Sequence, residues 1–563
     1  MIIGLDVGGT HTDAVLIGCN GVENHVKVPT DPDNLFATVM ECLNALIQGY
    51  QATDISRLVL STTLATNLVV QNRLPQAALL VSGGPGLDPR LFQCCEQYHI
   101  IDGALDHNGR EIEALDEKTV RRIGKTLQKA DIPYVGVVSK FSVRNPDHEL
   151  RMAELLKPYC KRVFMGHMFS GSLSFPRRIA TTYLNTAVYP VHRDFFQAVE
   201  RSLFEKGLKV PIRILKPDGG NMNLSGSLTY PGLTVLSGPA ASVMGAIAHA
   251  PADKCCLVLD IGGTTTDMAI ILDGAPVIAP HGITIGPYRT LIRALMTRSV
   301  GIGGDSVIHV DNRNLIVGPE RAGVAAAHGG PQPTTTDALC VLGRLAEGDP
   351  ELARQALQPI ADALDMDIST AAEHIFATAC RGILKSAEEL VMHINSRPVY
   401  TVHEMFEGLQ IKPDHILLLG GPADLFAEGL QQIFDGQVET LPRWQVKNAF
   451  GCALARTTCE VTVFADTAQK SIATQGENLH QRIPADFDLS DARNTATELV
   501  RKKAIERGAN PDYLKIEILE ESSFNMIRDF QFTGKNIRVR AQVKPGIIHG
   551  YDSVTEKITR NDL

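Results

Sequence analysis

Short apolar runs separated by glycine and polar turns dominate the first 85 residues and predict strands packed against helices. The start of the chain is expected to be a β-hairpin around a polar glycine turn, followed by a third strand. Further strands are expected to be buried, because their apolar residues are continuous. The expected strands are residues 2–5, 14–17, 22–28, 58–60 and 77–81, and the expected helices are 35–47 and 64–71.

Between about residues 85 and 225 the pattern changes, and stretches with helical periodicity alternate with short apolar strands. The expected helices are 117–127, 147–156 and 177–203, and the expected strands are 135–138 and 163–165. A segment of this length is large enough to enclose a core of its own. It therefore predicts an α/β insertion.

From about residue 226 the first pattern returns, again with an apolar strand, a glycine turn and a second strand. The expected strands are 257–260, 268–272 and 416–419, and the expected helices are 337–346, 350–364 and 370–395. The tail is expected to form a helix at 492–507 and strands at 515–519 and 537–543, and it has no chemical motif.

A chain of 563 residues is long enough for three or four domains. The change in pattern predicts four units, with the insertion separating two lobes. The predicted boundaries are 1–84 for the first lobe, 85–225 for the insertion, 226–460 for the second lobe and 461–563 for a C-terminal appendage.

An internal repeat links the two predicted lobes. Residues 6–13 read Asp-Val-Gly-Gly-Thr-His-Thr-Asp, and residues 260–267 read Asp-Ile-Gly-Gly-Thr-Thr-Thr-Asp. Each copy lies between two apolar strands. Because both sequence and setting recur, the repeat predicts two related halves that face each other. Two unrelated hairpins with similar turn residues are the alternative.

The residue types of the repeat suit a polyphosphate. Paired glycines bring backbone N–H groups close to a ligand, and threonine hydroxyls add donors. An aspartate at the end of a strand offers oxygen to Mg²⁺, often through water. Asp6 and Asp260 are therefore the candidate catalytic and magnesium-holding residues. The candidate phosphate-binding residues are Gly8, Gly9, Thr10, Thr12, Gly262, Gly263, Thr264 and Thr266.

Two further glycine turns could complete the same site. Gly303 and Gly304 lie in a turn that permits close approach of a ligand, and Gly420 and Gly421 follow a strand and open a helix. Each is also compatible with a simple turn. The sequence contains no Gly-x-x-x-x-Gly-Lys-Ser/Thr motif, which argues against a P-loop ATPase.

Other polar residues near these turns could have either a structural or a functional role. Asp13 and Asp267 could cap backbone amides, and His11 could be a packing residue rather than a phosphate contact. The Ser-Thr-Thr run at 61–63 could cap the helix that follows or contact substrate. The histidines form no His-Glu-x-x-His motif, so no dedicated transition-metal site is expected.

Composition narrows the class of protein. Apolar residues make up 44% and charged residues 21%, which is typical of a soluble globular chain. A net charge of −9 and a single tryptophan argue against nucleic acid as a partner. No apolar run reaches 18 residues, so no membrane span is expected. The start does not resemble a secretory signal, and the eleven scattered cysteines suit a reducing cytoplasm.

Taken together, the motifs resemble those of the acetate kinase, Hsp70 and actin superfamily. Within it the chain most resembles the hydantoinase A/5-oxoprolinase family, which includes ketone carboxylase subunits. The resemblance rests on segments 6–13, 61–67, 141–146, 182–185, 237–241, 260–267, 317–323 and 333–338, and it extends to about residue 460. It implies an α/β fold of duplicated, actin-like (ribonuclease H-like) ATPase lobes, with an inserted α/β subdomain and a small C-terminal α+β unit.

The same resemblance implies ATP and Mg²⁺ as cofactors. The expected activity is hydrolysis of a cyclic amide of the hydantoin or 5-oxoproline type, through phosphorylation of the amide carbonyl. A hydantoinase B-like second subunit and assembly into an oligomer are also implied. The segment at 324–333 is shorter than in the family, and the tail resembles it weakly, which leaves the substrate open. The alternatives are a small-molecule kinase, a ketone carboxylase subunit, and a nucleotide-gated regulatory or chaperone-like module.

Overall fold

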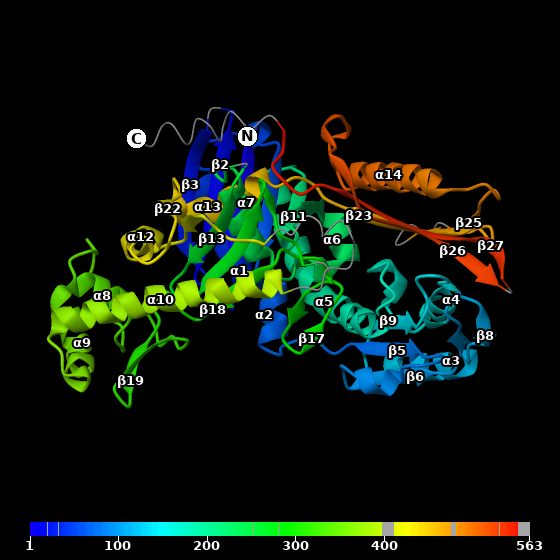
Figure 1. Ribbon diagram of the computed structural model, residues 1–563, viewed down its shortest axis with the longest axis horizontal. Coiled ribbons are helices and arrows are strands. Elements are labelled where there is room, and N and C mark those ends of the chain that lie inside the picture. The colour runs from blue at the N-terminus through cyan, green and yellow to red at the C-terminus, as the bar shows by residue number, and fades with distance from the viewer. Residues whose placement is uncertain are drawn as a thin grey trace.

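The computed structural model describes the chain except for residues 20, 32, 252, 280, 397–409, 475–479, 529 and 550–563. Figure 1 shows two central sheets with helices between and around them. The inserted segment lies at the lower right of this view, and the C-terminal segment lies at the upper right. The chain is a mixed α/β protein.

The first central sheet has six strands in the order β12-β11-β4-β1-β2-β3. Its strands are β1 (Ile2–Val7), β2 (His11–Gly18), β3 (Gly21–Pro29), β4 (Arg57–Thr62), β11 (Ile212–Leu215) and β12 (Asn221–Asn223). The predicted hairpin and third strand form an antiparallel meander, and β4 and β11 run parallel to β1. Helix α1 (Leu35–Leu46), capped by Asn34, covers one face together with the end of α5 (Phe175–Glu205).

The second central sheet repeats this arrangement, with the order β15-β14-β13-β21-β22 and β18 also paired to β14. Its strands are β13 (Cys255–Ile261), β14 (Thr266–Leu272), β15 (Ala275–Pro276), β18 (Thr297–Val300), β21 (His415–Leu419) and β22 (Gln437–Thr440). Asp260 lies opposite Asp267, as Asp6 lies opposite Asp13. Because β21 is parallel to β13, as β4 is to β1, the sequence repeat is also a repeat of topology.

Two helices, α7 (Ser237–Ile247) and α13 (Lys447–Leu454), pack against each other and against the central strands (Figure 1). The crossing is very close. A Cβ on Gly451 would lie 2.1 Å from the Ala241 carbonyl oxygen, and one on Gly4 would lie 2.0 Å from the Ala449 carbonyl oxygen. Glycine at these two positions therefore lets β1, α13 and α7 stack in direct backbone contact, which joins the two lobes.

A helical layer covers the second sheet on its other side. It consists of α8 (Thr335–Val341), α9 (Pro350–Leu364), α10 (Ile368–Asn395) and α12 (Ala423–Gln431). Phe376 and Phe426 pack between these helices and the sheet. Helix α8 is shorter than the predicted 337–346, because its end at Val341 is followed by Gly343 at φ 69°.

The insertion has a four-stranded parallel sheet in the order β10-β9-β5-β6. Its elements are β5 (Ala78–Ser82), β6 (Gln97–Ile101), β9 (Tyr134–Ser139), β10 (Arg162–Met165), α3 (Glu117–Lys129), α4 (Asp147–Leu156) and the first half of α5. Sheet membership differs from the predicted boundaries at 84 and 225: β5 belongs to this sheet, and β11 and β12 belong to the first sheet. The boundaries differ because the sequence of a short apolar strand does not indicate which sheet the strand joins.

The C-terminal unit is a five-stranded antiparallel sheet in the order β25-β24-β23-β27-β26, covered by α14. Its elements are β23 (Glu460–Asp466), β24 (Ser471–Thr474), β25 (His480–Arg482), α14 (Leu489–Glu506), β26 (Ile516–Arg528) and β27 (Gln531–Val543). The last two strands are much longer than predicted. The alternation of apolar and polar residues expected for β26 is interrupted by polar residues from Glu520 to Ser523, because this part of the hairpin extends into solvent.

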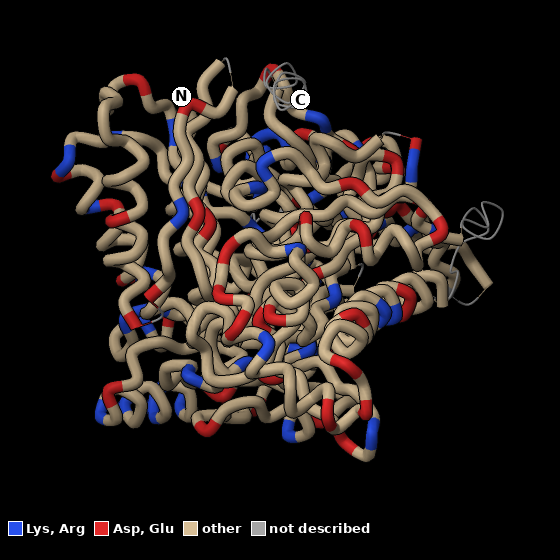
Figure 2. The backbone as a smooth tube through the Cα atoms, turned by 90° about the vertical axis from the view of Figure 1, so that its left-hand side faces the viewer, with Lys and Arg blue, Asp and Glu red and all other residues tan. Residues whose placement is uncertain are grey.

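The remaining elements are short connections. They are α2 (Leu64–Val70), α6 (Leu224–Thr229), β7 (Ala104–Leu105), β8 (Glu111–Glu113), β16 (Thr284–Ile285), β17 (Tyr288–Arg289), β19 (Ile308–Asp311) and β20 (Asn314–Val317). Acidic and basic residues are interspersed along the backbone in Figure 2. Among the described residues, no helix combines the length and the apolar character needed to cross a bilayer.

Candidate functional site

The fold brings the two copies of the repeat together at the centre of the molecule. Asp6 lies one residue before the end of β1, and Asp260 lies one residue before the end of β13. The charge of Asp260 contributes to raising the pKa of Asp6. The side-chain amide of Asn448, on α13, connects them. Its Nδ2 donates to Asp260 Oδ2 at 3.2 Å, and it also hydrogen-bonds to Asp6. The two predicted acidic residues therefore share one location.

Both carboxyl groups lie in surroundings that disfavour an unpaired negative charge. Burial raises the pKa of Asp6 to about 7, although a hydrogen bond with Ser61 acts in the other direction. Burial also raises the pKa of Asp260, whose Oδ2 accepts a hydrogen bond from Ser242 Oγ at 2.5 Å. Within the described part of the chain, Asp6 Oδ1 is buried and has no hydrogen-bond partner.

These properties fit a magnesium ion. Mg²⁺ binds carboxylate oxygens directly or through its waters, and Asp6 Oδ1 is an oxygen that still needs a partner. A divalent cation would also offset the repulsion between Asp6 and Asp260. The pair therefore has the donor chemistry of a magnesium site.

The turn of each hairpin presents free backbone donors. Each turn is closed by one hydrogen bond, from Gly8 N to the His11 carbonyl at 3.0 Å and from Gly262 N to the Thr265 carbonyl at 2.9 Å. The next two amides in each turn, those of Gly9, Thr10, Gly263 and Thr264, donate to no other residue that the structure describes. A row of unpaired amides is suited to anionic oxygen.

Two of the predicted phosphate-binding threonines form hydrogen bonds within their own half of the molecule. The hydroxyl of Thr12 is buried and lies 2.9 Å from that of Thr30, and buried Thr266 donates to the Ile302 carbonyl at 2.7 Å. These hydroxyls hold neighbouring strands and loops inside each lobe. The contact of these two threonines with phosphate stays a prediction.

The turn containing Gly303 and Gly304 supports the second hairpin. Gly304 N donates to the Gly262 carbonyl at 3.0 Å, and Asp305 N donates to the Gly263 carbonyl. A Cβ on Gly303 would lie 2.5 Å from the Gly262 carbonyl oxygen, so glycine is needed for this contact. The turn therefore supports the second hairpin, and its contact with a ligand stays a prediction.

The turn at Gly420 and Gly421 lies beside Asp260. Gly420 has φ 97°, and a Cβ there would lie 2.5 Å from Asp260 Oδ1. Gly421 is exposed, and a Cβ on it would have nothing within 4 Å. A Cβ on Gly9, in the first hairpin, would likewise meet nothing within 4 Å. These two glycines therefore leave open space for a ligand.

For the polar residues beside the hairpin turns, the sequence allowed either a structural or a functional role. Asp13 is paired with Lys27, whose Nζ lies 2.7 Å from Asp13 Oδ1, and this contact favours the structural role. Thr62 Oγ1, one residue before the N-cap Thr63, accepts a hydrogen bond from Leu64 N at 3.1 Å and so satisfies the first amide of α2. The pKa of His11 is lowered by burial and by the charges of Lys27 and Arg321, which places the first turn near the second lobe.

Sequence reasoning missed Asn448, Ser242 and Lys27. They come from α13, α7 and β3, and no motif marks them as neighbours of the aspartates. The Ser-Gly-Pro start of α7 is the nearest signal. Ser237 Oγ lies 3.1 Å from Ser61 Oγ, which connects that helix start to the end of β4.

The fold and site define an α/β protein with two topologically matched halves and an acidic centre. Its fold matches the crystal structure of ATP-dependent caprolactamase from Pseudomonas jessenii, with a TM-score of 0.70 and 19% identity over 96% of this chain and 87% of that one. Family models described as hydantoinase/oxoprolinase and its N-terminal region match residues 178–461 and 2–160. The chain belongs to the hydantoinase/oxoprolinase family, as the sequence predicted.

Two curated relatives are subunits of larger enzymes. The caprolactamase alpha subunit of Pseudomonas jessenii is 25% identical over 62% of this chain and 55% of its own length. The acetophenone carboxylase gamma subunit of Aromatoleum aromaticum is 27% identical over 61% of this chain and 53% of its own length. The chain thus matches little more than half the length of either relative.

Proposed function

We propose that the two hairpin turns bind the phosphates of ATP between two actin-like lobes, with Mg²⁺ held by Asp6 and Asp260. The observation that carries this proposal is the convergence of two equivalent turns, each with two unpaired amides, on a pair of buried carboxyl groups. Gly9, Gly421 and the open space beside them would accommodate the nucleotide. The caprolactamase whose fold this chain shares is named as ATP-dependent, which supports the same conclusion.

The reaction that fits this site is ATP-dependent opening of a cyclic amide. The amide carbonyl oxygen attacks the γ-phosphorus and ADP leaves. Water then adds to the activated carbon, the ring C–N bond breaks and the amine leaves, giving an acyl phosphate. A second water releases phosphate and leaves an open amino acid. Bound magnesium supplies charge neutralisation, and the amides of Gly9 and Gly263 orient phosphate oxygens.

Asp6 is suited to a second task in this scheme. Burial raises its pKa to about 7 in the absence of a metal, and a bound Mg²⁺ would favour the carboxylate form. As a carboxylate, Asp6 could also accept the proton of an attacking water. Asp260 receives hydrogen bonds from Ser242 and Asn448 and is the more fixed of the two.

Product analysis tests this function. The protein is incubated with ATP, Mg²⁺ and 5-oxoproline, hydantoin or caprolactam, and products are separated by mass. ADP, phosphate and an open-chain acid in equal amounts support the proposal. A stable phosphorylated alcohol would instead identify a kinase. ATP turnover that responds to protein partners but to no small molecule would identify a regulatory module.

A carboxylase subunit is the second candidate, favoured by the acetophenone carboxylase relative. In that case phosphate release would require a ketone together with bicarbonate. Both relatives are named as subunits, and this chain matches about half of their length, so we propose that a hydantoinase B-like second subunit assembles with it. Co-purification with the product of a neighbouring gene, followed by the assay above with and without it, tests this partner.

A further inference from the structure

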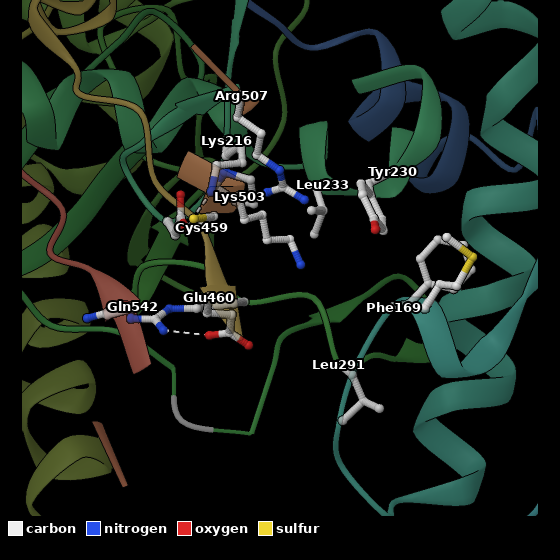
Figure 3. Close-up of a pocket in the computed structure, with 14 residues that line it drawn as sticks. Phe169, Lys216, Tyr230, Leu233, Leu291, Cys459, Glu460, Lys503, Arg507 and Gln542 are labelled. Atoms are coloured by element: carbon white, nitrogen blue, oxygen red, sulfur yellow. Dashed lines mark hydrogen bonds and ion pairs between the residues drawn. The ribbon is translucent and has the colours of Figure 1, made fainter. Parts of the chain in front are cut away.

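The C-terminal unit borders two cavities, and charged groups that pair with one another line the first. Figure 3 shows this first cavity, beside the C-terminal end of α14. Among the described residues that line it, both carboxyl groups have cationic partners. Asp218 Oδ2 lies 2.8 Å from Lys216 Nζ, and Glu460 Oε2 lies 2.7 Å from Arg293 Nη1. These ion pairs are complete without a ligand.

The second cavity lies between the insertion and the C-terminal unit. The loop 142–147 and His167 line it on one side, and strands β23, β24 and β27 line it on the other. We call it the β23 cavity. Its volume is about 290 Å³, near the lower end of the range for small-molecule pockets. The C-terminal unit is held to the first sheet by Arg213, whose Nη2 donates to the Gly508 carbonyl at 2.6 Å.

The insertion borders the β23 cavity at the carboxyl edge of its parallel sheet. Ser142 and Arg144 follow the end of β9, and His167 follows the end of β10. In the order β10-β9-β5-β6, strand β6 lies on one side of β5, whereas β9 and β10 lie on the other. Open parallel sheets bind ligands outside the carboxyl ends of their strands, where the strand order reverses in this way. The cavity therefore has the place in the fold that a ligand site takes.

His167 is held by a buried carboxylate and has one ring nitrogen left over. Glu149, on α4, is fully buried, and its Oε2 accepts hydrogen bonds from His167 N at 2.8 Å and from His167 Nδ1 at 2.6 Å. Burial opposes ionisation of Glu149, but its hydrogen bond with His167 lowers its pKa. The other ring nitrogen, Nε2, is buried and has no partner among the described residues. Such a nitrogen gains free energy from a ligand that bonds to it.

Two further polar atoms from the lining of the cavity also lack a partner. Ser142 Oγ and Arg144 Nε are buried, and no residue that the structure describes hydrogen-bonds to either. Ser142 is 1% exposed and His167 is 5% exposed. The Arg144 Nε–H can only donate, the Ser142 hydroxyl can donate or accept, and His167 Nε2 accepts or donates according to whether the ring is neutral or protonated. A matching ligand therefore offers both donors and acceptors.

The charges around the cavity are balanced by groups already in place. The charged side chains that line it, His167 aside, are Arg144, Asp147 and Asp466. Burial lowers the pKa of Arg144, and the charge of Asp466 acts in the other direction. Asp466 also accepts a hydrogen bond from Gln469 N at 2.9 Å, and Asp147 lies in the first turn of α4, where the helix end favours a negative charge. A neutral ligand fits these surroundings better than an ion does.

We propose that the β23 cavity binds a small neutral polyol, whose hydroxyl groups hydrogen-bond to Ser142 Oγ, Arg144 Nε and His167 Nε2. Each hydroxyl donates one hydrogen bond and accepts up to two, so several hydroxyls on one molecule match all three atoms without adding charge. This site is separate from the paired hairpins and does not depend on the function proposed for them. Because two units bound the cavity, a polyol bound there would hold the C-terminal unit against the insertion.

Calorimetric titration of the full chain with myo-inositol tests the proposal. The comparison ligands are cyclohexanol, which has the same ring with one hydroxyl, and myo-inositol 1-phosphate, which adds negative charge to the same polyol. Inositol is expected to bind at least about tenfold more tightly than cyclohexanol and at least as tightly as its phosphate. Absence of inositol binding, or equal binding of cyclohexanol, would overturn the role of the three unpartnered atoms. Tighter binding of the phosphate would overturn the neutral class of ligand.

Matched variants locate the site. Ser142→Ala should weaken inositol binding about tenfold, and Ser225→Ala, at an exposed position on α6, should leave it unchanged. Ala473→Phe, on β24, places a ring in the cavity from its other side and should abolish binding. Saturating ATP with Mg²⁺ should not displace inositol. Equal effects of the two serine variants, full binding by Ala473→Phe, or displacement by ATP would overturn the assignment.

Discussion

The hairpins β1–β2 and β13–β14 have nearly the same eight residues and the same register, but they are supported differently. In the first hairpin, Lys27 pairs with Asp13. In the second, burial and the nearby charge of Asp260 raise the pKa of Asp267 to about 6. The turn of the second hairpin is also braced by the loop at Gly303 and Gly304. A shared motif thus fixes the local shape, and its surroundings decide how its charges behave.

The difference between the copies predicts which residues are hard to replace. The second turn cannot relax, because a neighbouring loop bonds to its carbonyl groups. The first turn has a hydrogen bond from Thr30 N to the Thr10 carbonyl at 2.9 Å, and Gly9 faces open space. We therefore expect ligand binding to order the first turn more than the second.

The largest expected effect comes from removing either central carboxyl group. Asp6→Ala and Asp260→Ala should each lower ATP turnover by about 10²–10³, because each removes a proposed ligand of the Mg²⁺ that would neutralise developing charge. Steady-state phosphate release measures this, with the exposed Asp33→Ala as a control. Turnover near that of the wild type in Asp260→Ala would contradict its role and make the two copies functionally unequal.

The next prediction compares a glycine that packs against the second turn with a glycine that faces open space. Gly303→Ala should destabilise the protein by about 1–3 kcal/mol, since its Cβ would overlap the Gly262 carbonyl oxygen. Gly9→Ala should change stability by less than about 0.5 kcal/mol. Urea unfolding measures both. Equal destabilisation by the two changes would show that the turns are supported alike.

Lys27→Met tests the ion pair that belongs to the first hairpin alone. It leaves the buried carboxyl group of Asp13 without its cation and should cost about 1–3 kcal/mol of unfolding free energy. Lys129→Met, on the surface of α3, is the matched control and should have little effect. If both variants unfold at the same urea concentration, Lys27 does not stabilise the first hairpin.

A further expected effect is a dependence of stability on pH. Burial raises the pKa of Asp6 to about 7 from 3.8, so the folded state holds a proton that the unfolded state releases first. The contribution of Asp6 to the free energy of unfolding is therefore fully present below about pH 4 and is lost as the pH rises toward 7. Asp6→Asn should unfold with a weaker pH dependence than the wild type between about pH 4 and 7. An unchanged dependence would assign the effect to another group.

The sequence determined most of the local structure. Apolar runs and glycine turns predicted the central hairpins and the strand at 416–419, and helical periods predicted α3, α4 and α9. These elements are specified by residues close together in the chain, so they can be predicted from the sequence alone. The family followed from the same motifs, and the family models confirm it.

Only the tertiary structure decided which strands share a sheet and which side chains surround the aspartates. The chain leaves the first sheet after β4 and rejoins it at β11, and the hydrophobic pattern cannot show that return. Asn448 and Ser242 reach Asp260 because α13 and α7 cross where glycine permits backbone contact. Contacts between distant segments depend on packing of the whole chain, and for this reason the residues that hold the acidic centre carry no local signal.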